Sequence, residues 1–290
     1  MFSKNRFLSL LRTRRFFREV LHVESCTSTM DLGAEMVASA TTSNIEGSII
    51  ITDQQTRGRG TKQRSFESSR TGNVYTTLVF SYDSDEYPFP PLFLVRAVPA
   101  ALCDAISSVG VSSPPMIKWP NDVWIAGKKT AGILIETSSM GPRMTCFVGI
   151  GVNLNTNPSV ADPALKDIAT CVKDNVAATE DTRDAVIDRE EFLVTFCEHL
   201  EKYLSPSYAS VLEHTYRERS VIIGRRVRVF PNGVVGVRTS LLATGAPDAC
   251  LAQWDGVALS VDSFGFLKVR RDDTAEEVVL SAEEVSLRLV

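Results

Sequence analysis

The chain has 290 residues, 44% of them hydrophobic and 23% charged, which is an ordinary globular composition and enough length to bury a sizeable core. Its formal net charge of −4 argues against a protein whose main partner is nucleic acid, because such proteins usually present a basic field. The length predicts one large domain together with a smaller one.

Cysteine and histidine occur without the spacing of a metal site. The six cysteines are scattered with no Cys-x-x-Cys pair, and His22, His199 and His214 lie far apart in the sequence. This use of cysteine, without a secretory signal, favours a reducing compartment over a disulfide framework. No apolar run reaches the length of a membrane span, so we expect neither a protein-held metal nor a membrane partner.

Residues 1–18 are rich in arginine and contain no acidic residue. Such a start is typical of a mitochondrial transit peptide, and it fits equally well a basic strand or helix that belongs to the folded domain. The segment is too short for a helix-turn-helix DNA-binding domain. We therefore expect a cytoplasmic or mitochondrial protein that does not bind DNA.

A strand is predicted over Val20–Glu24, followed by a helix that contains Leu32 and Met36 at helical spacing. Ser28 or Thr29 is placed to cap the start of this helix, because a hydroxyl there can accept a backbone N–H bond. Capping alone would explain these two hydroxyls, and contact with a ligand is the alternative.

A basic, glycine-bearing stretch, Asp53–Ser68, follows the apolar strand Gly47–Thr52. Glycines let backbone N–H groups approach an anion closely, and guanidinium groups match phosphate oxygens. The stretch is neither a Walker loop nor a dinucleotide fingerprint, and a flexible surface loop would have the same composition. Its basic residues are Arg57, Arg59, Lys62 and Arg64.

The next elements read as core. Thr71–Phe80 predicts a strand after a glycine turn, and Leu92–Val109 predicts an apolar helix that Pro99 should kink or split. Asn157–Ile187 is polar and irregular, with room for a short helix. Asp188 with Glu191 forms a capping-box pattern before a helix with an apolar packing face.

Between these core elements, Lys118–Glu136 combines a turn, a basic corner and a strand. Asn121-Asp122 supplies turn chemistry after Pro120, and Gly127 allows a hairpin before the pair Lys128-Lys129. The two lysines are either solvated at the tip of a hairpin or held in a cleft as a point charge.

Two further stretches complete the pattern. Thr145–Asn155 predicts a buried strand that ends at Asn153, whose side chain suits hydrogen bonding to a ribose or base. From Ile223 onward, short alternating segments are evenly spaced, as in a small β-barrel. These segments are 226–230, 234–239, 250–254, 257–261, 264–269 and 278–289.

Together these stretches resemble the biotin protein ligases. Lys118–Glu136 is similar to their Lys-Trp-Pro-Asn-Asp…Lys-x-x-Gly-Ile-Leu-x-Glu block, and Gln55–Ser68 to their Gln-Thr-x-Gly-Arg-Gly-Arg-x-Gly-Arg-x-Trp-x-Ser loop. Gly149–Asn153 is similar to their Gly-Ile-Gly-Ile-Asn motif, and Ala282–Arg288 to their terminal Gly-Glu-Val-Ser-x-Arg. The resemblance covers nearly the whole chain, with the blocks in the same order.

Four positions depart from the family pattern. Met30 follows Ser28-Thr29 where the family usually has asparagine, and Glu283 replaces a glycine. Thr61 stands where many members have arginine, which predicts weaker retention of the reaction intermediate. Phe66 replaces a tryptophan and still offers a flat face for adenine.

The resemblance implies an α+β fold. Residues 19–220 would form a class II aminoacyl-tRNA-synthetase-like catalytic domain with a mixed sheet, and 221–290 an SH3-like β-barrel, after the basic segment 1–18. The implied biotin-binding residues are Ser28, Thr29, Gln55, Gly58, Arg59, Gly60, Lys129 and Gly132. The implied adenylate-binding residues are Arg64, Phe66, Asn121 and Asn153, and the implied catalytic residues are Lys129, Arg59 and Asp122.

The implied reaction uses ATP and Mg²⁺ to form biotinyl-5′-AMP and then biotinylates a lysine of a biotin carboxyl carrier domain. The carrier would belong to an acetyl-CoA, propionyl-CoA or methylcrotonyl-CoA carboxylase. Lipoate or octanoate transfer on the same fold is the alternative, although the polar groups of Ser28, Thr29 and Gln55 suit a ureido ring better than a fatty chain. A non-catalytic binder or DNA-binding regulator is a third, and the oligomeric state stays open.

Overall fold

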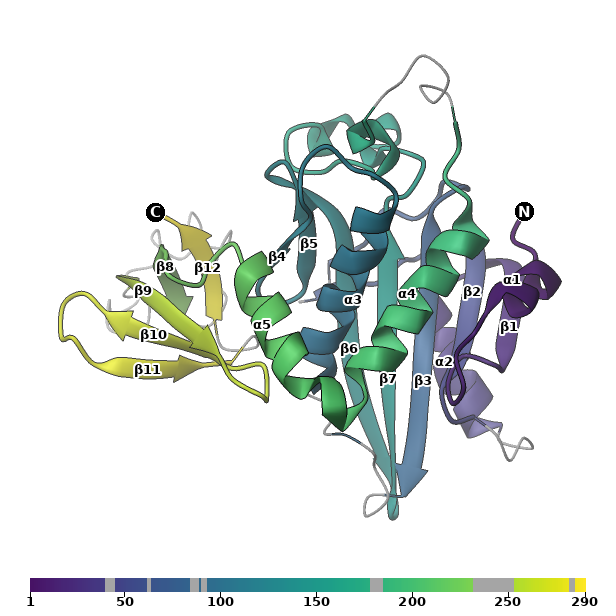
Figure 1. The fold of residues 1–290 in the computed structure, drawn as a ribbon, viewed down its shortest axis with the longest axis horizontal. Coiled ribbons are helices and arrows are strands. Elements are labelled where there is room, and N and C mark those ends of the chain that lie inside the picture. Colours follow the sequence, from purple (N-terminus) through teal and green to yellow (C-terminus); the bar gives the residue numbers. More distant parts are fainter. Residues whose placement is uncertain are drawn as a thin grey trace, which may run out of the picture. The chain divides into compact units, whose positions relative to one another are not determined.

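The computed structural model describes residues 1–39, 45–61, 64–83, 89, 93–177, 185–231, 253–281 and 285–290. The chain forms two compact units, whose elements are drawn in Figure 1. The first unit comprises Met1–Ile117 and Asn121–Arg219, and the second comprises Lys118–Pro120 and Ser220–Val290. Every residue predicted to bind a ligand or to act in catalysis belongs to the first unit.

A mixed sheet forms the centre of the first unit. Its strands are β1 (Val20–Cys26), β2 (Ser48–Gln55), β3 (Val74–Asp83), β4 (Met116–Lys118), β5 (Asp122–Ile125), β6 (Lys128–Met140) and β7 (Arg143–Val152). Their order in the sheet is β1-β2-β3-β7-β6-β5-β4. Strands β1 and β2 pair in parallel, whereas β2–β3, β3–β7, β7–β6 and β6–β5 are antiparallel. The predicted mixed sheet is confirmed.

Helices lie on both faces of this sheet. They are α1 (Lys4–Leu10), α2 (Thr29–Ala38), α3 (Leu94–Ser108), α4 (Arg189–Tyr203) and α5 (Ala209–Arg219). Figure 1 shows α3 and α4 in front of the sheet and α2 behind it. Because both faces are covered, β3 is buried from Val74 to Tyr82, and its polar residues Thr76, Thr77 and Ser81 are buried together with the apolar ones. Short 3₁₀ turns at Pro158–Val160, Pro163–Leu165 and Lys173–Asn175 occupy the region predicted to be irregular.

Helix α3 runs through Pro99 without interruption, so the predicted split at this residue is wrong. A proline inside a helix removes one backbone hydrogen bond and costs about 3 kcal/mol. Here Ala97–Leu102 are all buried, and α3 packs against α4, α5 and the sheet. The burial of this apolar helix therefore offsets the lost hydrogen bond.

The basic N-terminal segment is folded as part of the first unit. Phe7 and Phe17 are fully buried, and α1 packs against α4. The Arg6 guanidinium donates to Glu191 at 2.7 Å, and the Phe17 N–H donates to the Gly47 carbonyl at 2.7 Å. The structure therefore shows the folded alternative for residues 1–18, while import into mitochondria stays a prediction.

The second unit contains an antiparallel sheet in the order β11-β10-β9-β8-β12. The strands are β8 (Arg226–Pro231), β9 (Trp254–Val261), β10 (Leu267–Arg271), β11 (Glu277–Leu280) and β12 (Val285–Leu289). Val227, Val229 and Val269 are fully buried in its core, and the Trp119 indole donates to the Gly265 carbonyl at 2.9 Å. The sheet is not a closed barrel among the described residues, and the strand predicted at 234–239 and most of that at 250–254 lie outside them.

Candidate active site

A pocket in the first unit collects most of the predicted site residues. Its walls come from the start of α2, the end of β2, the basic loop after β2, the β5–β6 hairpin and the C-terminal end of β7. The predicted residues that line it are Ser28, Thr29, Gln55, Arg59, Gly60, Arg64, Phe66, Asn121, Asp122, Lys129 and Gly132. Gly58 and Asn153 are not among the lining residues.

Only one of the two neighbouring lysines lines the pocket. Ala126 and Gly127 both have positive φ, which makes a tight turn between β5 and β6. Lys129 follows this turn, and its Nζ lies 2.6 Å from Asp122 Oδ1. The Lys128 ammonium instead donates to the Lys166 carbonyl at 2.8 Å. The hairpin therefore holds one ammonium–carboxylate pair in the pocket, as the cleft hypothesis predicts.

The backbone of Lys129 is fixed from a second direction. Its N–H donates to the Ile168 carbonyl, and its carbonyl accepts the Thr170 N–H, each at 2.9 Å. Nothing in the sequence pattern of this irregular segment predicted the contact. Residues 168–170 thus pair in parallel with β6 at one bridge, between Ala169 and Lys129, and set the position of the lysine.

Glycines of β6 and β7 form the part of the pocket on which Phe66 lies. Gly132 and Gly151 pair across the two strands, and a Cβ added to either would meet the Phe66 ring. The Lys129 Nζ lies 5.8 Å from the centroid of the same ring, within reach of a cation–π interaction. Without side chains at these two positions, the strands leave room for one flat group against the backbone.

The opposite part of the lining is polar and buried. Gln55 Oε1 accepts the Thr29 N–H at 2.9 Å and the Thr29 hydroxyl at 3.3 Å, and Thr77 donates to Thr29 Oγ1 at 2.8 Å. Ser28 Oγ caps α2 by accepting the Met30 N–H at 3.2 Å, which confirms the predicted N-cap. These bonds occupy Gln55 Oε1 and leave the side-chain NH₂ as the group that Gln55 can offer to a ligand.

The basic loop folds back on itself beside the pocket. The Gly60 N–H donates to the Arg64 carbonyl at 2.8 Å, and the Phe66 N–H donates to the Gly58 carbonyl at 3.0 Å. Gly58 thereby supports the loop from behind, where a Cβ would collide with the Phe66 carbonyl and with Ser68. Lys62, the fourth basic residue of the stretch, lies outside the described residues.

The Arg59 guanidinium faces two carboxylates. It donates to Asp31 Oδ1 of α2 at 3.0 Å and to Glu136 Oε1 of β6 at 2.5 Å. Neither acid carried a predicted role. Arg64 also lines the pocket, so an anionic ligand would meet Arg64 and Lys129 and would compete with the two acids for Arg59.

The side chains of the two predicted asparagines donate hydrogen bonds to backbone carbonyls. Asn121 Nδ2 donates to the Ile133 carbonyl at 2.8 Å beside the pocket, and Asn153 Nδ2 donates to the Thr170 carbonyl at 3.1 Å outside it. Asn153 is 3% exposed, and its Oδ1 accepts no hydrogen bond from the described part of the chain. A buried acceptor of this kind usually has a partner, so Asn153 keeps one unused position for a ligand or water.

Residues that sequence reasoning left out also line the pocket. Met30 and Thr61 were treated only as departures from the family pattern, and no role was assigned to Ser65. The others are Ile133, Leu134, Gly149, Ile150 and Gly151. The glycines at 149 and 151 were detectable, because residues two apart on a strand share one face.

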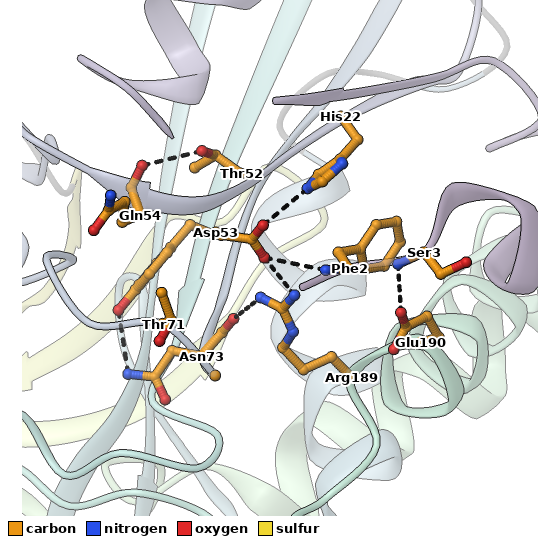
Figure 2. A network of polar contacts seen from close by, with 12 residues as sticks. Phe2, Ser3, His22, Thr52, Asp53, Gln54, Thr71, Asn73, Arg189 and Glu190 are labelled. Atoms are coloured by element: carbon orange, nitrogen blue, oxygen red, sulfur yellow. Dashed lines mark hydrogen bonds and ion pairs between the residues drawn. The ribbon is translucent and has the colours of Figure 1, made fainter. Parts of the chain in front are cut away.

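A buried polar network lies next to the end of β2 (Figure 2). Arg189 of α4 donates to Asp53 Oδ1, and also to the Asn73 carbonyl at 3.2 Å. Asp53 Oδ1 also accepts the Phe2 N–H at 3.3 Å, and its Oδ2 lies 3.2 Å from His22 Nε2. Burial favours a higher pKa for Asp53, but the bonds and charges of Arg189 and His22 outweigh it and lower this pKa.

The same network fixes the chain after β7. Asn73 Oδ1 accepts the backbone N–H groups of Leu154, Asn155 and Thr156 at 2.9–3.0 Å. Asp53 stands two residues before Gln55, so Arg189 connects the strand that ends at the pocket with the turn that follows β7.

Metal binding by protein groups alone has no candidate in the described residues, where no three His, Cys, Asp or Glu side chains gather to hold an ion. In the same part of the chain, no helix has the length and apolar character to cross a membrane.

Comparisons of the sequence with known proteins all find ligases of the biotin/lipoate type. Residues 23–153 match the family described as the biotin/lipoate A/B protein ligase family. A Mycobacterium tuberculosis protein named biotin–[acetyl-CoA-carboxylase] ligase is 30% identical over 70% of this chain and 74% of its own length. The Bacillus subtilis protein named bifunctional ligase/repressor BirA is 30% identical over 69% of this chain, which spans 59% of that relative.

A solved structure shares the fold. The biotin protein ligase from Aquifex aeolicus in complex with biotin and ATP superposes with a TM-score of 0.66 at 22% identity, over 94% of this chain and all of that one.

Proposed function

Since the chain belongs to the biotin/lipoate A/B protein ligase family, we propose that it is an ATP-dependent biotin–protein ligase. It activates biotin as biotinyl-5′-AMP and transfers the biotinyl group to a lysine of a biotin carboxyl carrier domain. The observation that carries this proposal is the pocket itself, where the Lys129–Asp122 pair and Arg64 share one lining with the buried polar groups of Thr29 and Gln55.

In the first step the biotin carboxylate attacks the α-phosphorus of ATP, a P–O bond forms, and pyrophosphate leaves. Both reactants are anionic, so the protein has to hold like charges together and stabilise the charge that develops. Lys129 supplies a point charge and Arg64 a fork of donors. Mg²⁺ would arrive on the nucleotide phosphates, since this ion typically uses few protein ligands and several phosphate oxygens.

In the second step the amine of the acceptor lysine attacks the acyl carbon, an amide bond forms, and the bond from the acyl carbon to the phosphate oxygen breaks. AMP leaves, and the proton lost by the amine passes to solvent. No covalent enzyme intermediate is needed. Asp122, 2.6 Å from Lys129, orients the ammonium during both steps. Asn153 Oδ1 is a buried acceptor that a nucleotide donor group could reach once the loops adjust around the ligand.

Lipoate or octanoate is the alternative acid on this fold. A ureido ring needs hydrogen-bond donors and acceptors, whereas a fatty chain needs an apolar tunnel. Thr29 and Gln55, both less than a tenth exposed, make this part of the lining polar, and the Gln55 side-chain NH₂ can donate to a ureido carbonyl, which favours biotin. For the acceptor, the name of the Mycobacterium relative favours an acetyl-CoA carboxylase, with propionyl-CoA and methylcrotonyl-CoA carboxylases as the other candidates.

Two further parts of the proposal concern the rest of the chain. The antiparallel sheet of the second unit is part of an SH3-like barrel, by resemblance to the family. The protein works in the cytoplasm or in mitochondria, where carboxylases with biotin carriers would be its substrates.

The test is ATP–pyrophosphate exchange by the purified protein with biotin, lipoate or octanoate as the acid. Exchange with biotin alone supports the proposal. A biotin carboxyl carrier domain added next should then become biotinylated, with release of AMP. Exchange with lipoate or octanoate alone would move the assignment to the alternative acid. No exchange with any of the three acids would favour a binding protein.

A further inference from the structure

Met30 occupies the pocket lining immediately after the two hydroxyl residues. It is the second residue of α2, and its side chain is 5% exposed. It shares the lining with Thr29 and Gln55 on the polar side and with Leu134 on the apolar side. The large, flexible Met30 side chain therefore lies next to Thr29 and Gln55, the groups proposed to recognise the ureido ring of biotin.

The Met30 thioether fills a space that Gly149 leaves open. A Cβ added to Gly149 would lie 2.8 Å from Met30 Sδ and 3.0 Å from Met30 Cγ. Phe66 lies in the same way over Gly151. Residues two apart on a strand point to the same face at a spacing of about 7 Å, so Met30 and Phe66 are anchored on neighbouring positions of one face of β7.

Behind Met30 lies a cluster of apolar side chains. The cluster that contains it includes Ile50, Val79 and Phe147, with Met36 of the same helix packed against it. Met30 is the only residue that belongs to both this cluster's buried core and the pocket lining, within the described residues. Its side chain thus separates the pocket from an apolar region beneath α2.

We propose that Met30 is a specificity-determining residue that limits the depth of the acid site. The proposal rests on the proposed function, and it explains how one pocket accepts a compact acid with a polar head and rejects an unbranched fatty acid. A long apolar chain would have to enter the space that the thioether fills, and a shorter side chain at this position opens that space toward apolar surroundings.

The experiment compares wild type, Met30→Ala and Met36→Ala in ATP–pyrophosphate exchange with biotin and with octanoate. Met36→Ala is the matched control, because it removes the same side chain from the same helix and cluster without touching the pocket. For Met30→Ala we expect a biotin KM about tenfold higher, octanoate activity at least tenfold higher, and an unchanged KM for ATP. Met36→Ala should keep the wild-type preference for biotin.

The outcomes distinguish a failure of the role assigned to Met30 from a failure of the proposed function. Wild-type protein that exchanges with biotin, together with an unchanged biotin-to-octanoate ratio in folded Met30→Ala, overturns the role of Met30 and leaves the proposed function intact. Wild-type protein that is silent with biotin overturns both. Where circular dichroism shows that Met30→Ala is unfolded, Met30→Val gives the same test with a smaller change in volume, and a ratio equal to the wild-type ratio again contradicts the proposal.

Discussion

Lys129 is the residue on which the proposed chemistry depends most. Its ammonium lies beside Asp122 in the pocket, whereas Lys128 is engaged with the Lys166 carbonyl. Removing a charge that stabilises a transition state typically costs a factor of about 100 to 1,000 in rate. We therefore expect Lys129→Ala to lower pyrophosphate exchange by at least about a hundredfold and to weaken biotin binding much less.

Lys128→Ala is the control for this prediction, because it removes a neighbouring lysine that does not line the pocket. Exchange rates and equilibrium binding of biotin are measured side by side for both variants. An exchange rate in Lys129→Ala that matches the rate in Lys128→Ala would rule out the role assigned to Lys129.

Thr61 is expected to affect how long the pocket retains biotinyl-5′-AMP. It lines the pocket at a position where the resemblance predicts arginine. A guanidinium there would add charge-assisted hydrogen bonds to the phosphate of the intermediate. Thr61→Arg should slow the release of biotinyl-5′-AMP about tenfold, measured by trapping released intermediate with time, while Thr61→Gln, similar in reach but uncharged, should not. Equal release rates in the three proteins would contradict this expectation.

Residue types and motif spacing were enough to predict most of the pocket, because the predicted residues follow strand ends that the topology brings together. Residue types and spacing did not reveal which charged side chains form ion pairs in the folded protein. Arg59 was predicted to bind biotin and to act in catalysis, and its guanidinium pairs with Asp31 and Glu136 from two other elements. Such pairings depend on the tertiary arrangement of α2 and β6, which no local pattern encodes.

At the scale of elements, the basic loop is tied to α2 and β6 by the Arg59 side chain. The three side chains of this cluster are each about 40% exposed, and exposed ion pairs contribute at most about 1 kcal/mol. The loop is therefore held weakly and should open easily. Glu136→Gln should increase the rate of tryptic cleavage after Arg57, Arg59 or Arg64 several-fold, measured by mass spectrometry in the absence of ligand.

Salt provides an independent check of the same cluster. Screening weakens exposed ion pairs, so about 0.5 M NaCl should raise the cleavage rate in wild type and have less effect in Glu136→Gln. Glu277→Gln, which removes an exposed ion pair of the second unit, is the control. A cleavage rate that is insensitive to both Glu136→Gln and salt would show that the ion pairs do not hold the loop.

Elements with a strong local signal were predicted well. Ser28 and Asp188 accept the N-cap bonds expected of them, and the strands before and after the basic loop overlap the predicted ranges. The predicted split at Pro99 is wrong, because a local rule about proline was outweighed by the packing of α3. It also gave no hint that the irregular segment near Ile168 pairs with Lys129, since that contact has no periodicity.

At the scale of the whole first unit, the Asp53–Arg189 pair joins elements that are far apart in the sequence. Figure 2 shows Arg189 reaching from α4 to Asp53 of β2 and to Asn73, while the Phe2 N–H and the His22 ring also contact the Asp53 carboxylate. Both side chains of the pair are 9% exposed. Removing one partner of a buried pair typically costs about 3–5 kcal/mol, because the other charge is left uncompensated.

The lowered pKa of Asp53 gives this contribution a definite dependence on pH. The carboxylate stabilises the fold above the pKa of Asp in the unfolded chain, about 3.9, and the contribution disappears as the pH falls from there through the lower pKa of the folded state. Asp53→Asn should therefore be much less stable than wild type at pH 7, and the difference should shrink below about pH 4. Urea unfolding followed by circular dichroism at pH 7 and pH 3 measures the unfolding free energies, with Glu277→Gln, which removes an exposed ion pair, as the control. If the difference in unfolding free energy between wild type and Asp53→Asn stays constant from pH 7 to pH 3, the ionised Asp53 carboxylate does not stabilise the first unit.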